Sequence, residues 1–120
     1  MKLRPATAAD IPALHALETK LFPSDRLSLW SFRYHRKNAR AFLRVLAGPD
    51  KIPAGYILVL YRGKTARLYS IALAPAAQGQ GWGGKMMQAA IKDAKQRGAA
   101  KISLEVRARS HKVVKLYESF

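Results

Sequence analysis

Apolar and polar positions in the first third of the chain follow the period of a helix. Between residues 11 and 21 the apolar positions recur every three or four residues, at Ile11, Leu14, Leu17 and Leu21. Thr7 and Asp10 precede this stretch and resemble a capping box in which Asp replaces the usual Glu or Gln. A second helix is predicted for residues 28–37, and residues 2–4 predict a short strand before both helices.

From residue 41 onward the pattern becomes that of strands. Short apolar runs rich in aliphatic and aromatic residues cover residues 41–46, 54–61 and 67–73. The turn signals Gly48-Pro49-Asp50 and Arg62-Gly63-Lys64 separate these runs. The three runs therefore predict consecutive antiparallel strands.

The last third predicts a helix, a strand and a final helix. Residues 84–97 return to the helical period and Gly98 caps them, residues 102–106 alternate as a strand does, and another helix is expected from about Ser110. The buried stripe predicted for residues 84–97 is Met87, Ala90, Ile91 and Ala94. The order β-α-α-β-β-β-α-β-α predicts an α/β fold with a mixed sheet, in which antiparallel strands precede one βαβ unit. Since no linker or repeat interrupts the chain, we expect a single domain over residues 1–120.

Charge narrows the choice of partners. Lys and Arg number 22 against 7 Asp and Glu, a formal net charge of +15, while 49% hydrophobic residues suffice for a packed core. An anionic partner is therefore expected. The absence of cysteine excludes disulfides, thiolate nucleophiles and cysteine metal sites, and the histidines show no metal spacing. Without a membrane-length apolar run or a signal-peptide pattern, we expect a cytoplasmic protein with neither a metal nor a membrane partner.

A glycine-rich loop is the main candidate for ligand binding. Four of the eight glycines lie within residues 79–84, between a predicted strand and a predicted helix. Glycine lets backbone N–H groups approach a ligand closely, and the start of a helix attracts anions. Residues 51–92 contain no acidic residue. The loop is therefore predicted to hold a phosphate or pyrophosphate, the alternative being a merely flexible connection.

Two motifs fit this loop. Gly79-x-Gly81-x-x-Gly84 satisfies the dinucleotide fingerprint, with Glu105 about twenty residues further on. That fingerprint should follow its strand immediately, but residues 74–78 intervene, and the βαβ unit stands too late in the chain for a second nucleotide-binding half. We therefore reject it in favour of the second motif.

The second motif, Gln78-x-x-Gly81-x-Gly83, resembles the pyrophosphate loop of the GNAT family of N-acetyltransferases, which follows a strand ending in an Ala-Pro step as residues 70–75 do. Residues 104–107 and 116–118 resemble the ribosomal-protein-alanine N-acetyltransferase branch of that family. The resemblance spans the whole chain in element order. It implies a GNAT-like fold that transfers acetyl from acetyl-CoA to an amine. Because the family continues into roughly two further strands, those two strands are expected to be lacking here.

The resemblance also implies the cofactor site. Backbone amides of Ile71, Ala72 and Leu73 would bind the pantetheine arm. Ser110 stands where this branch often has an Asn that touches the cofactor. The amides implied for the pyrophosphate are those of Gly79, Gln80, Gly81, Trp82, Gly83 and Gly84.

For catalysis, the resemblance assigns the general base to Glu105 and the general acid to Tyr117, with an oxyanion donor near Leu73. Taken alone, Glu105 is equally explained by an ion pair on the polar face of a strand, and Tyr117 by packing in an apolar helical stripe. With no cysteine for an acetyl-enzyme, direct attack in a ternary complex is expected.

Acid–base chemistry favours a protein or peptide N-terminus as acceptor. At pH 7 an α-amine is about 10% neutral, whereas a lysine amine is only about 0.04% neutral. The six Lys and Arg residues of the acid-free stretch 26–44 would attract an acidic or ribosomal substrate. Two alternatives stay open: a small-molecule amine acceptor, or a nucleic-acid-binding module with Trp30, Phe32 and Tyr34 among the arginines.

Overall fold

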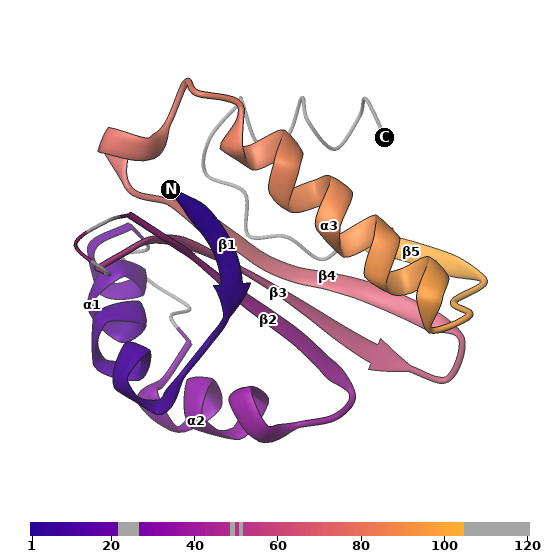
Figure 1. The fold of residues 1–120 in the computed structure, drawn as a ribbon. Coiled ribbons are helices and arrows are strands. Elements are labelled where there is room, and N and C mark those ends of the chain that lie inside the picture. Colours follow the sequence, from indigo (N-terminus) through magenta and orange to yellow (C-terminus); the bar gives the residue numbers. More distant parts are fainter. Residues whose placement is uncertain (22–26, 49, 51, 105–120) are drawn as a thin grey trace.

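Five strands form one mixed sheet in the order β1-β2-β3-β4-β5 (Figure 1). The computed structural model describes residues 1–21, 27–48, 50 and 52–104. The strands are β1 (Lys2–Pro5), β2 (Ala41–Ala47), β3 (Pro53–Arg62), β4 (Thr65–Leu73) and β5 (Lys101–Leu104). The helices are α1 (Ile11–Leu21), α2 (Leu29–Lys37) and α3 (Trp82–Gln96), with short 3-10 turns η1 (Ala8–Asp10) and η2 (Pro75–Ala77).

The connections confirm the predicted fold class. Strands β1 to β4 pair antiparallel, and β5 joins β4 in parallel after the crossover through α3. Helices α1 and α2 cover one face of the sheet and α3 crosses the other (Figure 1). The predicted helix from Ser110 lies outside the described residues.

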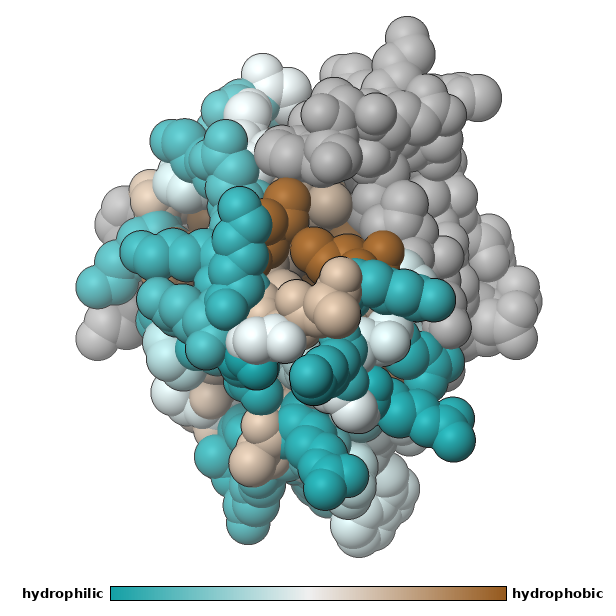
Figure 2. Space-filling view, turned by 90° about the vertical axis from the view of Figure 1, so that its right-hand side faces the viewer, coloured by the Kyte–Doolittle hydropathy of each residue, from teal (hydrophilic) through white to brown (hydrophobic). Residues whose placement is uncertain are grey.

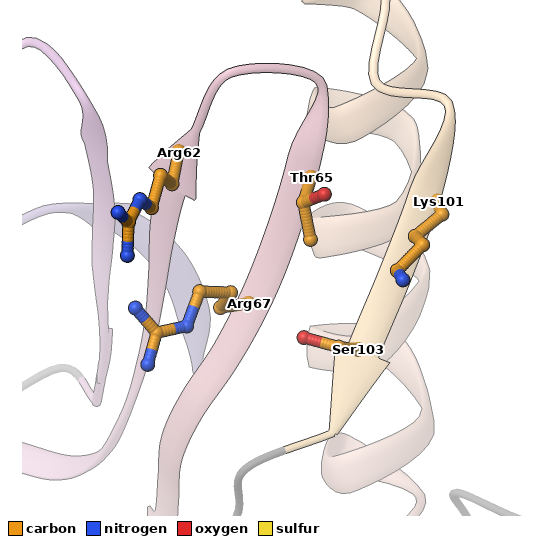
Figure 3. A pocket seen from close by; sticks show the side chains of 5 residues that line it. All are labelled: Arg62, Thr65, Arg67, Lys101 and Ser103. Carbon is orange, nitrogen blue, oxygen red and sulfur yellow. The ribbon is translucent and has the colours of Figure 1, made fainter.

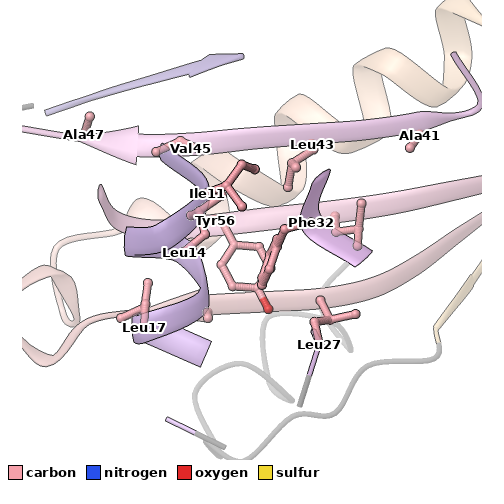
Figure 4. Close-up of a cluster of buried hydrophobic side chains, with 12 residues drawn as sticks. Ile11, Leu14, Leu17, Leu27, Phe32, Ala41, Leu43, Val45, Ala47 and Tyr56 are labelled. Atoms are coloured by element: carbon pink, nitrogen blue, oxygen red, sulfur yellow. The ribbon is translucent and has the colours of Figure 1, made fainter. Parts of the chain in front are cut away.

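Alternation along the central strands divides the core into two clusters. Tyr56 and Leu58 of β3 point to the face covered by α1 and α2, and Ile57 and Val59 to the α3 face. In the first cluster (Figure 4), the ring of Phe32 packs edge-to-face on that of Tyr56, with centroids 5.3 Å apart. Both faces of the sheet are therefore buried over its central strands.

The boundaries of α3 differ from the sequence prediction. The helix begins at Trp82, two residues earlier than predicted, with Gly81 as its N-cap. Met86 is fully buried and Ile91 is only half-buried. The predicted buried stripe was therefore wrong in including Ile91 and in omitting Met86. Gly98 has φ +75° and the next N–H, of Ala99, bonds Ala94 O at 2.9 Å, which confirms its capping role. None of the helices in the described part of the chain has the length and apolarity to cross a membrane.

A buried carboxylate joins β1 to the start of α1. Asp10 accepts hydrogen bonds from the backbone N–H of Thr7 at 2.7 Å and from both terminal nitrogens of Arg4 at 2.7 and 3.0 Å. The capping pattern seen in the sequence is thus confirmed. The Arg4 guanidinium holds the pKa of Asp10 below its ordinary value despite burial.

Replacement of Asp10 should therefore weaken the fold in a pH-dependent way. Because the pKa of Asp10 is lower in the folded state, its stabilisation is complete above the unfolded pKa, about 4, and is lost as pH falls further. Asp10→Asn should lower the free energy of unfolding at pH 7 by about 1 kcal/mol and flatten its decline below pH 4. Urea titrations at several pH values measure both effects. The exposed Asp50→Asn control should leave the acid limb unchanged, and an equally steep acid limb in Asp10→Asn would contradict the assignment.

Candidate active site

The glycine-rich loop lies between the end of β4 and the start of α3 (Figure 1). Gly79 and Gly81 have φ of +78° and +82°, in the left-handed region that side chains disfavour. A Cβ at either position would meet no atom within 4 Å, so the backbone conformation, and not space, calls for glycine here. Of the other two loop glycines, Gly83 is buried and Gly84 half-buried in the first turn of α3.

Two glutamine side chains brace this loop. The Gln78 amide nitrogen donates to the carbonyl of Leu73, and that of Gln80 to the carbonyl of Ala76, both at 3.0 Å. Ala77, directly before Gln78, is fully buried. The glutamine of the motif therefore fastens the loop to the end of β4, where Leu73 is the last residue.

The first turn of α3 presents backbone donors. The helical ladder begins with the Lys85 N–H bonded to Gly81 O at 3.2 Å. The N–H groups of Trp82, Gly83 and Gly84 therefore precede the ladder, at the positive end of the helix dipole. The Lys85 ammonium lies 4.5 Å from the centre of the Trp82 ring and adds a cation to the same corner. This arrangement suits a phosphate or diphosphate.

Strand β4 changes its pairing just before this loop. Opposite β3, Leu58 pairs with Ser70 while Val59 pairs with Leu68, so Tyr69 is the extra residue of a β-bulge. Within the described residues, the parallel ladder to β5 ends at the pair Leu68↔Leu104. Strand β4 itself continues to Leu73, next to the loop.

Along residues 71–74 the backbone N–H groups point alternately toward β3 and away from it. The Ala74 N–H donates to Ala54 O at 2.7 Å, across to the β3 side. Successive N–H groups along a strand point to opposite edges, so the N–H of Leu73, and that of Ile71 two residues earlier, point to the β5 side. The N–H of Ala72 points to β3. The structure thus brings Ile71, Ala72 and Leu73 next to the glycine-rich loop, whereas Glu105, Ser110 and Tyr117 lie outside the described residues.

A buried polar network holds the other side of the bulge. Glu18 of α1, Tyr56 of β3 and Ser70 of β4 each have 0% exposure. The Tyr56 hydroxyl donates to the Glu18 carboxylate and lies 2.7 Å from the Ser70 hydroxyl. Glu18 also accepts the backbone N–H of Leu27 at 2.6 Å. The network therefore joins α1, the start of the α2 segment, β3 and the bulged strand.

Sequence reasoning did not single out this network. A signal was present, because Glu18 interrupts an otherwise apolar helical stripe, and a buried acid is uncommon without partners. Tyr56 and Ser70 stood within apolar strand runs and gave no signal of their own. Their meeting depends on the register of three elements.

A pocket of about 430 Å³ opens at the opposite end of β4 (Figure 3). Ala66 and Leu68 pack in the cluster with α3, so alternation directs Thr65 and Arg67 to the face that carries α1 and α2. The lining residues come from three neighbouring strands: Arg62, Thr65, Arg67, Lys101 and Ser103. Three of these five side chains are cationic.

The histidines offer no metal site among the described residues, where no group of three potential His, Cys, Asp or Glu ligands occurs. His35 is half-buried on α2, and burial lowers its pKa. We assign it a packing role at the side of α2.

Tyr56 provides a test of the buried network. Tyr56→Phe removes the hydroxyl that donates to Glu18 and contacts Ser70, and should lower the free energy of unfolding by about 1–3 kcal/mol. Tyr34→Phe is the matched control, since Tyr34 is 66% exposed and should tolerate the change. Denaturant titration compares the two variants. Equal stability of both variants would show that the network contributes nothing.

Comparison with known proteins identifies this arrangement. Residues 11–120 match the model of the acetyltransferase (GNAT) family. The ribosomal-protein-S18-alanine N-acetyltransferase of Escherichia coli superposes with a TM-score of 0.81 and 27% identity, over 98% of this chain and 74% of that one.

Two more distant structures share the fold alone. A putative acetyltransferase from Agrobacterium tumefaciens gives a TM-score of 0.79 at 24% identity, over 99% of this chain and 90% of that one. An aminoglycoside 6'-N-acetyltransferase from Acinetobacter haemolyticus gives a TM-score of 0.77 at 17% identity, over 99% of this chain and 88% of that one. No curated protein matches the sequence. The family match, together with the glycine-rich loop at the end of a bulged β4, shows that the chain belongs to the GNAT family and is an acetyl-CoA-dependent N-acetyltransferase.

Proposed function

We propose that this enzyme acetylates the α-amine at the N-terminus of a protein or peptide, with acetyl-CoA bound at the end of β4. The observation that carries the cofactor site is the pair of left-handed glycines, Gly79 and Gly81, in front of the open amides of α3. These amides would hold the diphosphate of CoA, as the loop of the family does. Lys85 would add a cation, and no acidic residue occurs in the loop to oppose the phosphate charge.

The pantetheine arm would lie along the end of β4, at residues 71–73. Of the three residues implied by the family, Ile71 and Leu73 direct their N–H groups away from β3, so they are the favoured donors. A strand amide near Leu73 would also stabilise the oxyanion formed from the thioester carbonyl. Ser110 would contact the cofactor with its hydroxyl.

In the proposed reaction, the neutral amine nitrogen attacks the thioester carbonyl carbon in a ternary complex. Glu105 accepts the amine proton, directly or through water, and Tyr117 donates a proton to the departing CoA thiolate. The bond from nitrogen to the acetyl carbon forms as the carbon–sulfur bond breaks. A direct transfer is consistent with a chain that contains no cysteine.

Two lines of support favour a polypeptide N-terminus as acceptor. An α-amine supplies far more neutral nucleophile at pH 7 than a lysine side chain does. The E. coli protein that shares 27% identity is named for action on an alanine of a ribosomal protein.

The cysteine-free composition is consistent with a cytoplasmic location. A small-molecule amine is the second candidate, since the aminoglycoside acetyltransferase shares the fold, but a polycationic acceptor would be repelled by a net charge of +15.

Nucleic-acid binding is a weaker alternative. Of the three aromatic residues that suggested it, Phe32 is fully buried in the core. Trp30 and Tyr34 are 75% and 66% exposed on α2, and the Arg33 guanidinium lies 5.5 Å from the Trp30 ring. Two exposed rings beside arginines are compatible with a secondary contact to RNA, but they do not explain the glycine-rich loop.

Calorimetric titration with CoA tests the cofactor site. The protein should bind CoA saturably, and Gly81→Ala should weaken binding about tenfold, because a left-handed alanine costs about 1–2 kcal/mol and moves the loop amides. Gly98→Ala is the matched control, since it places the same strain at φ +75° at the other end of α3. Wild-type affinity in Gly81→Ala, or equal weakening in both variants, would argue against the loop as the diphosphate site.

A pH profile tests Glu105 as the base. Glu105→Gln should lower kcat/KM for an N-terminal peptide most strongly near pH 7, where about 10% of the α-amine is neutral, and progressively less toward pH 9. Initial rates at fixed acetyl-CoA measure this, with the surface variant Asp50→Asn as control. A deficit that stays constant across the pH range would remove Glu105 from that role.

A further inference from the structure

We propose that the pocket between β3, β4 and β5 binds an acidic side chain of the acceptor polypeptide, a few residues after its N-terminus. This inference rests on the proposed function and adds to it the chemical class of the acceptor. It assigns to Arg62, Arg67 and Lys101 a role in selecting the substrate.

The lining of the pocket is suited to a carboxylate. Two guanidinium groups and one ammonium surround it, and the hydroxyls of Thr65 and Ser103 add neutral donors (Figure 3). None of the described lining residues is acidic. A volume of about 430 Å³ is ample for one acidic side chain with its hydration water. The site therefore offers both charge and hydrogen bonds to a single anionic group.

The backbone beneath these cations is firmly held. Lys64 O in the β3–β4 turn accepts the N–H of Ala100 at 2.7 Å, which secures the start of β5 beside that turn. The Tyr61 N–H donates to Arg40 O at 2.8 Å and secures the start of β2. Cations carried on paired strands lose less conformational freedom on binding than cations carried on loops.

The surroundings reinforce the positive potential. Lys37, Arg40 and Lys64 are exposed at the same end of the sheet. The carboxylate of Asp93 on α3 is engaged with the Tyr61 hydroxyl at 2.6 Å and with Arg97 at 2.8 Å. Figure 2, which faces this end, shows a mainly hydrophilic surface around a small hydrophobic area. An acidic segment would therefore be attracted here before it binds.

The pocket lies within reach of the reaction centre. Arg67 precedes Ile71, a proposed cofactor contact, by four positions in β4, or about 13 Å along the strand. Ser103 precedes the proposed base Glu105 by two residues in the sequence. An extended peptide advances about 3.3 Å per residue, so a side chain at about position three to five would reach the pocket when the N-terminus reacts. This register favours a peptide over RNA, because the peptide already has to lie along this surface.

A set of peptide substrates that differ at one position tests the inference. A series with one common N-terminus would carry Glu, Gln or Lys at each of positions two to six, and kcat/KM would be measured at low and high salt. At one or two positions near three to five, kcat/KM for the Glu peptide should be about tenfold higher than for the Gln peptide, because its KM is lower. The Lys peptide should have the lowest kcat/KM. The preference should shrink at high salt.

Paired charge variants locate the effect. In the double variant Arg62→Gln with Lys101→Gln the Glu-to-Gln ratio should fall toward one. Lys92→Gln with Lys95→Gln is the matched control, because it removes the same charge from the exposed side of α3 on the opposite face. That control should keep the full ratio. Equal loss of the ratio in both double variants would attribute it to overall charge and overturn the pocket.

The outcomes separate this inference from the proposed function. If neutral and acidic peptides are acetylated equally well, the pocket assignment fails while N-terminal acetylation stands. If no peptide is acetylated, fluorescence anisotropy with labelled Glu and Gln peptides decides the pocket alone, and equal affinities overturn it. A single-stranded RNA oligomer could instead bind more tightly than the Glu peptide and displace it. If the double variant Arg62→Gln with Lys101→Gln also lost this RNA binding, the pocket would be assigned to nucleic acid.

Discussion

The structure depends on a strand whose two edges have different partners along its length. Over residues 65–68, β4 is paired on both sides, with β3 and with β5, and its pairing with β3 continues to Leu73. The N–H groups of Ile71 and Leu73 point away from β3, on the side where a ligand with amide groups could pair with them. Acetyl-CoA carries both amides and a diphosphate. The end of β4 and the glycine-rich loop that follows offer donors for each.

The bulge at Tyr69 is held from the face opposite α3. A buried carboxylate is costly unless its oxygens accept hydrogen bonds, and Glu18 meets that condition through Tyr56 and the Leu27 N–H. The same contacts join helix α1 to the bulged strand through Ser70. Movement of α1 would therefore disturb the backbone that the cofactor is proposed to use. We regard this network as the link between the α1–α2 layer and the cofactor site.

Positively charged side chains lie at two separate places on the molecule. Near the loop, Lys85 and the start of α3 face the proposed diphosphate. At the other end of β4, cations on three paired strands surround the pocket. The acids of the described chain are few, and Asp10, Glu18 and Asp93 are engaged in internal hydrogen bonds. Little negative charge is therefore left on the described surface to offset either site.

The sequence alone determined the features that depend on neighbouring residues. Helical and strand periods, the Thr7–Asp10 cap and the Gln78–Gly84 motif are local patterns, and the fold class and the family followed from their order. Glu105 and Tyr117 remain predictions of that family resemblance. Only the tertiary structure revealed the bulge at Tyr69, the burial of Met86 in place of Ile91, the Glu18 network and the basic pocket. Each of these depends on the register between segments distant in the chain, and register is set by how whole faces pack, a property that no short window of sequence contains.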